Sequence, residues 1–338
     1  IRNALIISAA LTPLLTFAQI IIFEPWYLFI IRILLGLVIG LVWPNCFNLL
    51  STWQKTSTPN QTKKFFNYFN FSWNLGFIGG LITGYFWAFF WSDYLAMIIS
   101  FFMSFLLIPF SFFLQKVPEG GFAEKISIDQ VVEKLPPVKG DSDPKIETMM
   151  LAFPILFSWI GLVILSIAKS IVIFSYPVFI KSFDENLSDL TYLVQAGIQF
   201  GQVIGLTLIN SMNPPKRKYS ALFSILALTA IATSFLVFRN ILMITILSIF
   251  SGLFYGLLHG VSMKIMLDYG TAKNTTKYST INEIIIGIGF GVTPIIAGYV
   301  AEVDIYLMFT FNVFLGICLF LFLFFRSRNI KWKKPKLN

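Results

Sequence analysis

The sequence predicts an all-α membrane protein, a polytopic bundle of apolar helices. Hydrophobic residues make up 57% of the 338 positions and charged residues only 12%, whereas soluble domains have about 25% charged residues. The mean hydropathy is +0.78. Many apolar runs are about 20 residues long, the length that an α-helix needs to cross a bilayer. Because these runs are continuous rather than alternating, they argue against a transmembrane β-barrel.

Ten apolar runs along the chain each predict one transmembrane helix. In order they are Ala4–Phe23, Trp26–Thr52, Phe65–Trp91, Tyr94–Gln115, Met149–Ile180, Leu187–Met212, Ser220–Phe238, Ile241–Asp268, Ser279–Ala301 and Ile305–Phe325. The one long polar connection contains Pro136-Pro137, which is typical of a linker. The predicted domains are an incomplete four-helix bundle (1–115), a linker (116–148), a six-helix bundle (149–326) and a basic tail (327–338).

The positive charges predict the orientation in the membrane. The chain has 25 Lys and Arg residues and a net charge of +9. Most of them fall in the termini and the loops of one side, and only Lys181 and Arg239 fall in loops of the other. Since cytoplasmic loops are enriched in Lys and Arg, both termini, the linker and the tail are expected in the cytoplasm. We predict the cell membrane, with an organelle membrane as the alternative, and no nucleic-acid partner.

Residues typical of cofactor sites are few. Cys46 and Cys318 both lie within predicted spans, where a cysteine is a small packing residue. His259 is the only histidine, and no cluster has the spacing of metal ligands. The phosphate-cradling loop of nucleotide-driven pumps and the zinc-binding helix motif do not occur. The sequence therefore predicts no metal, no cofactor and no enzymatic activity.

A helix of the first half recurs in the second half. At an offset of 216 residues, Gly36 aligns with Gly252, Gly40 with Gly256, and Pro44 with a glycine. The following helix repeats as well. Small residues spaced four apart let helix backbones approach closely in lipid. The residues expected to pack in this way are Gly36, Gly40, Pro44, Gly80, Gly84, Gly252, Gly256 and Gly298.

The two copies are the second and eighth spans, six apart in the chain, so the halves run parallel, as in one class of secondary transporters. The second half has two helices without partners in the first. We therefore infer that two helices that would precede Ile1 are missing, untraced or lost.

These features resemble the major facilitator superfamily over the whole chain. Arg32 to Pro44 is similar to the family's fourth helix, Asn74 to Tyr85 to its fifth and Gly287 to Tyr299 to its eleventh. The resemblance implies two six-helix bundles joined by a cytoplasmic linker, and transport by rocker-switch alternating access. Trp43-Pro44-Asn45-Cys46, together with Lys169 eight residues before Pro177, is similar to the organophosphate antiporter branch, which implies an organic anion as the substrate.

Three stripes of polar side chains are candidates for the wall of a translocation path, because polar groups in a span face the bundle interior. The alternative is that they only bridge helices. Together with Tyr176, the residues are Asn67, Asn70 and Asn74; Gln195, Gln199 and Gln202; and Tyr255, His259 and Ser262, with Asn45 and Asn48 on the repeated helix.

Five charged or titratable residues in the spans are functional candidates. Lys169 lies too deep for easy snorkelling, so we expect it to bind an anionic substrate or a carboxylate partner, with a structural ion pair as the alternative. Arg32 either binds substrate or extends to the interface. Glu283 and His259 are candidates for proton coupling or gating, although for Glu283 we favour a pairing with a nearby lysine at the cytoplasmic end of its span. Asp268 is either a gating residue or an ion-pair partner of a lysine four residues before it.

The predicted function is secondary active transport of a small organic solute, with an organic anion as the favoured substrate, coupled to a proton or counter-solute. The alternative is a non-transporting subunit or scaffold derived from such a transporter. We expect a monomer in the lipid bilayer, unless the chain is part of a larger membrane complex.

Overall fold

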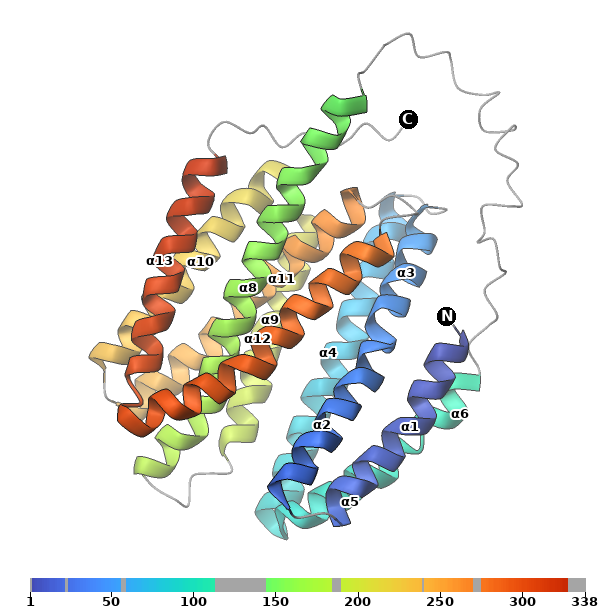
Figure 1. The fold of residues 1–338 in the computed structure, drawn as a ribbon, viewed down its shortest axis with the longest axis vertical. Helices are drawn as coiled ribbons and strands as arrows, with labels where there is room; N and C mark the ends of the chain where they lie inside the picture. Colours follow the sequence, from blue (N-terminus) through green and yellow to red (C-terminus); the bar gives the residue numbers. More distant parts are fainter. Residues whose placement is uncertain are drawn as a thin grey trace. The chain divides into compact units, whose positions relative to one another are not determined.

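The structure is a computed structural model, and it describes residues 2–21, 24–55, 59–112, 144–183, 190–238, 240–269 and 275–327. Within these ranges every regular element is an α-helix (Figure 1). The helices are α1 (Arg2–Ile21), α2 (Pro25–Gly40), α3 (Val42–Lys55), α4 (Pro59–Phe90), α5 (Asp93–Ser104), α6 (Leu107–Phe112), α8 (Pro144–Phe183), α9 (Leu190–Ser211), α10 (Pro214–Val237), α11 (Ile241–Tyr269), α12 (Thr275–Val303) and α13 (Leu307–Ser327).

Prolines define several helix boundaries. Helices α2, α4, α8 and α10 each begin at a proline, which fits the first helical position because the N–H that proline lacks has no partner there. Two predicted spans are interrupted instead of continuous. The breaks lie at Leu41, between α2 and α3, and at 105–106, between α5 and α6. Pro44 and Pro109 explain them, since a proline ring clashes with the carbonyl four residues earlier.

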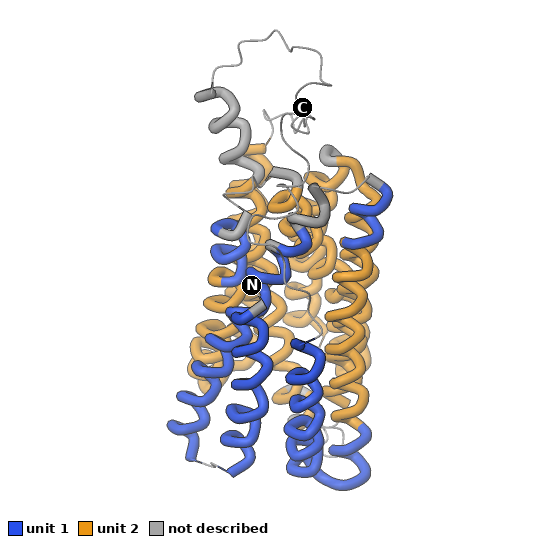
Figure 2. Tube along the Cα trace, turned by 90° about the vertical axis from the view of Figure 1, so that its right-hand side faces the viewer, with its two compact units in different colours: residues 1–65, 86–144, 272–283 blue, residues 66–85, 145–271, 284–338 orange. Residues whose placement is uncertain are grey.

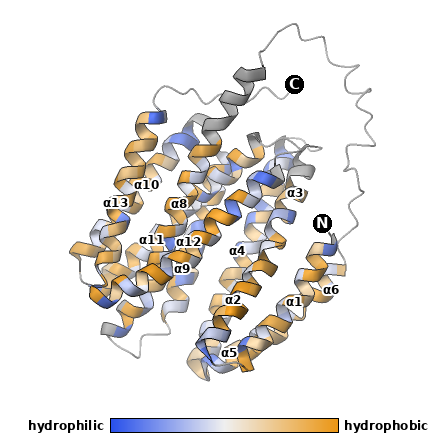
Figure 3. Ribbon diagram, in the orientation of Figure 1, coloured by the Kyte–Doolittle hydropathy of each residue, from blue (hydrophilic) through white to orange (hydrophobic). Residues whose placement is uncertain are grey.

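Nine helical segments of the described residues are long and apolar enough to cross a membrane. Figure 3 shows apolar residues along most of each helix. The chain is therefore an all-α polytopic membrane protein, as predicted. The predicted span Phe65–Trp91 corresponds to α4, which has 32 residues but is not among the nine. Its asparagines lower its hydropathy, and Asn70 and Asn74 are buried within the protein.

The described residues form two compact units (Figure 2). Unit 1 comprises 1–65, 86–144 and 272–283, and in it α1 packs against α2, α3, α5 and α6. Unit 2 comprises 66–85, 145–271 and 284–338, and in it α11 packs against α9 and α10, and α10 against α13.

The division into bundles 1–115 and 149–326 stays a prediction. Most of the predicted linker and tail lies outside the described residues.

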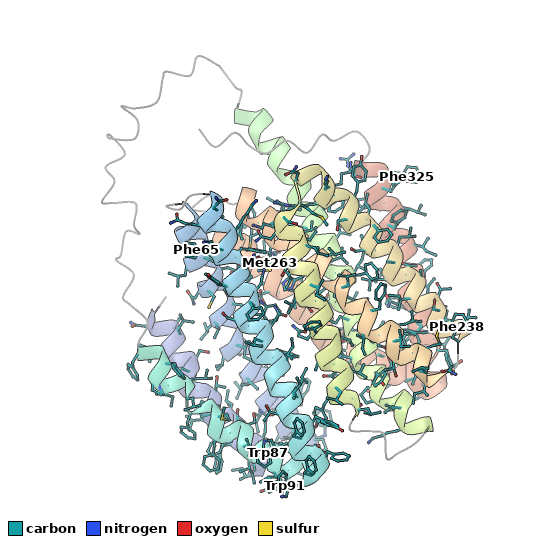
Figure 4. All side chains as sticks on the ribbon, turned by 180° about the vertical axis from the view of Figure 1, so that it is seen from behind. Phe65, Trp87, Trp91, Phe238, Met263 and Phe325 are labelled. Atoms are coloured by element: carbon teal, nitrogen blue, oxygen red, sulfur yellow. The ribbon has the colours of Figure 1, made fainter. Side chains whose placement is uncertain are left out.

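Aromatic side chains gather where α4 ends and α5 begins, in unit 1. Trp87 and Trp91 have ring centroids 4.7 Å apart, and Phe86 stacks on Phe90 at 6.2 Å. Figure 4 shows both tryptophans at this end of α4. Ser92 then caps α5, since its hydroxyl accepts a hydrogen bond from the Leu95 N–H. Clustered tryptophans are typical of a membrane–water interface.

Glycines bring α9 and α11 into backbone contact in unit 2. A Cβ atom on Gly252 would meet the Ile198 carbonyl, and one on Gly256 would lie 2.8 Å from the Gln202 carbonyl carbon. Gly201 and Gly205 face α11 in the same way. This contact holds the backbone of Gln202 in a fixed position relative to α11.

The other glycines predicted to pack closely have looser surroundings. Gly84 approaches Tyr192, whose ring would lie 3.8 Å from a Cβ atom. Gly36, Gly40, Gly80 and Gly298 have no described atom within 4 Å of that position. Their role in helix packing stays a prediction.

Candidate functional site

Lys169 lies inside the apolar part of α8, in unit 2. The apolar segment of α8 ends at Val178, nine positions after Lys169, which corresponds to about 14 Å of helix. The ammonium Nζ donates hydrogen bonds to Gln199 Oε1 at 3.1 Å and to Gln202 Oε1 at 2.6 Å. Both acceptors are neutral amides. Among the residues that the structure describes, no Asp or Glu forms an ion pair with Lys169.

The hydrogen bonds continue on both sides of the lysine. Gln199 Nε2 donates to Asn74 Oδ1 of α4 at 2.6 Å, and Gln202 Nε2 lies 3.3 Å from His259 Nδ1 of α11. Asn74, Gln199 and Gln202 are at most 2% exposed. We call Asn74, Lys169, Gln199, Gln202 and His259 the lysine–amide cluster. It joins four helices, α4, α8, α9 and α11, within one unit.

The lysine determines the orientation of every amide in this cluster. An ammonium group is only a donor, so both glutamine oxygens must face Lys169. The glutamine NH₂ groups must then face outward, one toward Asn74 and the other toward His259. Because Gln202 Nε2 is a donor, His259 Nδ1 must accept. His259 is therefore the neutral tautomer that carries its proton on Nε2.

Two further contacts surround the cluster. The Trp73 ring meets the His259 ring edge-on, with centroids 6.0 Å apart, and Lys169 Nζ lies 6.0 Å from the centroid of the Phe290 ring. Asn70 precedes Asn74 by one turn and is 2% exposed, and neither of its amide atoms has a hydrogen-bond partner among the described residues. An unsatisfied buried amide costs about 1–3 kcal/mol. A ligand or water that paired with Asn70 would recover this free energy.

The same helices are joined at a second level. Asn210 Nδ2 of α9 donates to Asn67 Oδ1 of α4 at 2.7 Å, so the polar stripe of α4 meets that of α9 twice. Ser158 and Ser262 exchange hydroxyl-to-carbonyl hydrogen bonds of 3.4 and 3.1 Å between α8 and α11. Asn210 was not among the predicted site residues, although it extends the glutamine stripe two turns beyond Gln202.

The remaining predicted residues lie elsewhere. Arg32 is exposed on the surface of α2, and Asn45 donates to the Leu41 carbonyl at the break between α2 and α3. Gln195 is half-buried one turn before Gln199, and Tyr255 is buried on α11. Glu283 is half-buried on α12, in the part assigned to unit 1. The side chains of Asn48 and Asp268 lie outside the described residues.

Tyr176, another predicted site residue, bridges α8 and α11. Its hydroxyl lies 2.8 Å from Thr245 Oγ1, which itself donates to the Ile241 carbonyl at 2.8 Å. The tyrosine is therefore the donor to the threonine. We expect the substitution Tyr176→Phe to lower the free energy of unfolding by about 1 kcal/mol, the net contribution of one hydrogen bond. Thermal unfolding in detergent measures this loss.

The matched control for Tyr176→Phe is Phe174→Leu, because Phe174 is 49% exposed on the same helix. An unchanged unfolding midpoint in Tyr176→Phe would contradict the assignment of the hydroxyl to helix bridging.

The structure defines a class of protein. It is a polytopic membrane protein, because its apolar helices are long enough to span a membrane, and it has a polar site, because these helices enclose a buried lysine and several amides. The family model of the Major Facilitator Superfamily matches residues 2–231 and 216–338, so it covers almost the whole chain. The chain belongs to this superfamily and is a membrane transporter of the major facilitator kind, as the sequence resemblance implied. A comparison with curated proteins found no match.

Proposed function

We propose that the chain is a secondary active transporter of a small organic anion, and that Lys169 binds the anionic group. The observation that carries this proposal is the ammonium group in the apolar part of α8, with neutral amides as its hydrogen-bond partners. A charge within a membrane span is costly and is typical of a substrate or ion pathway. An anion would neutralise the ammonium group, whereas a neutral or cationic solute would not.

The neighbouring groups suit the same ligand. The ammonium group of Lys169 has three N–H donors, and two of them bind amide oxygens among the described residues. An oxyanion can accept from the third donor and, by displacing an amide oxygen, from a second. The His259 Nε2–H and the Asn70 amide supply further donors on α11 and α4. A carboxylate or phosphate has enough lone pairs to accept from several donors at once.

Alternating access completes the proposal. The cluster residues come from four helices, so movement of one of these helices relative to the others changes the hydrogen bonds of the lysine. When the anion binds, it replaces Gln199 and Gln202 as the partner of Lys169. The anion therefore binds the conformations of the protein with different affinities, and a ligand can shift the population of conformations only in this way. The sequence resemblance implies a rocker-switch movement.

Uptake into proteoliposomes tests this proposal. Vesicles that contain the purified chain are preloaded with the unlabelled solute, so that both net uptake and exchange are detected. The labelled probes are lactate, succinate, glycerol 3-phosphate and inorganic phosphate, with glucose and choline as the neutral and cationic controls. We expect saturable uptake of at least one anion above protein-free vesicles, and none of glucose or choline. Uptake of no anion, or preferential uptake of choline, would contradict the proposal.

A further inference from the structure

His259 adjoins Lys169 through a single amide. The Gln202 side chain spans the two, with its oxygen 2.6 Å from Lys169 Nζ and its nitrogen 3.3 Å from His259 Nδ1. We propose that His259 Nδ1 binds a proton together with the anion, so that the transporter carries one proton with each anion. This inference rests on the proposed function and adds the coupling ion to it.

Without an anion, the cluster disfavours a proton on His259. The Gln202 NH₂ group faces Nδ1, so a protonated Nδ1 would place two donors against each other. Rotation of the amide by 180° would remove this conflict, but would then place the NH₂ group against the Lys169 ammonium. The hydrogen bonds of the cluster are therefore consistent with only one arrangement of protons, in which His259 is neutral.

The positive charge of Lys169, whose ammonium donates to the same Gln202 side chain that faces His259, also repels an imidazolium ion. Among the described groups packed against His259, Lys169 of α8 is the charged one, whereas Gln202 of α9 and Trp73 of α4 are neutral. On α11 itself the titratable neighbours are Tyr255, one turn away, and Lys264, whose ammonium lies 4.1 Å from the centroid of the Phe66 ring. No described carboxylate on these contacts would stabilise the imidazolium ion.

A bound anion removes both obstacles. The anion accepts from Lys169 and cancels its charge, so the Gln202 oxygen is no longer held by the ammonium. The amide can then turn its oxygen toward Nδ1 and accept from an Nδ1–H. The lone pair of Nδ1 takes a proton from a hydronium ion on the side where the anion enters. When the anion leaves on the opposite side, the N–H bond breaks and the proton passes to water there. Because binding linkage is reciprocal, the anion favours the proton as much as the proton favours the anion.

His259 is the only histidine in the chain, so nuclear magnetic resonance of ¹⁵N-histidine-labelled protein reports this one side chain. The protein is purified with a tag that contains no histidine. At neutral pH without an anion, we expect the nitrogen shifts of the neutral tautomer with the proton on Nε2. Addition of the anion that gave the fastest uptake among the four probes should convert most of this signal to the doubly protonated form at the same pH. The Nδ1–H tautomer, or a signal that the anion leaves unchanged, would overturn the inference.

Uptake with a proton gradient tests the coupling itself. In vesicles with an acidic exterior, we expect the wild-type chain to accumulate the same anion several-fold above its level without a gradient, and a proton carrier to abolish this gain. In His259→Gln, the ratio of uptake with and without the gradient should fall to about one. If uptake is present and depends on Lys169 but does not respond to the gradient, the proton inference fails and the proposed function stands. If no anion is taken up, the proposed function itself fails.

Discussion

The substitution Lys169→Met is expected to lower the rate of anion uptake at low concentration by about 100-fold. Methionine keeps an unbranched side chain out to the Cε position and a similar helix propensity, so the change removes mainly the ammonium group and its charge. Each hydrogen bond to a charged group contributes about 1.5–3 kcal/mol, and 1.4 kcal/mol corresponds to a factor of ten in affinity. Two such bonds from Lys169 to the anion therefore account for the expected loss. Initial rates in proteoliposomes with equal protein content measure it.

Two further variants make this test specific. Lys181→Met removes a lysine from the exposed last turn of the same helix, and uptake should remain at the wild-type rate. Lys169→Arg keeps the charge in a different hydrogen-bonding geometry, so it should retain more activity than Lys169→Met. Uptake by Lys169→Met within about threefold of the wild type would contradict the role of this lysine.

The second large effect is expected from Gly256→Ala. A Cβ atom there would overlap the Gln202 carbonyl group of α9, whose carbon lies 2.8 Å from that position. Since backbone rather than a flexible side chain must move, we expect a loss of about 1–3 kcal/mol in the free energy of unfolding. The same movement would shift Gln202, which is a partner of Lys169. Anion affinity should therefore fall together with stability.

The matched control is Gly291→Ala on α12, where no described atom lies within 4 Å of the added carbon. Alanine is favoured over glycine in a helix by about 1 kcal/mol, so this variant should be at least as stable as the wild type. Thermal unfolding in detergent compares the two. Equal destabilisation of both variants would show that the close contact of α9 and α11 is not the cause.

Helix positions followed from the sequence because they depend on local properties. Apolar runs predict the spans, and α11 begins at the predicted residue, Ile241. The breaks within two spans were missed, although Pro44 and Pro109 explain them. A proline in an apolar helix is also compatible with a continuous helix, as Pro13 in α1 and Pro294 in α12 show. The sequence alone does not say which outcome tertiary packing favours.

The sequence predicted which residues belong to the lysine–amide cluster, but it did not predict which of them contact one another. The stripe containing Asn74 and that containing Gln199 were candidates for a cavity wall or a helix bridge. In the structure these two residues bridge α4 and α9, and Gln199 also binds Lys169. The register between two helices depends on their packing, so stripe spacing does not reveal it. Likewise, Gly36 and Gly252 occupy equivalent sequence positions, but only Gly252 has a helix against it among the described residues.

A binding measurement tests the central claim, that an anion binds at Lys169. Its result does not depend on a coupling ion or on the orientation of the protein in a vesicle. The unfolding temperature of the purified chain is measured with increasing concentrations of the anion that is transported fastest. An anion at about 100 times its Kd stabilises the folded chain by about 2.7 kcal/mol. The wild type and Lys181→Met should therefore unfold at a higher temperature with the anion, and Lys169→Met should not. An equal rise in all three proteins would contradict the claim.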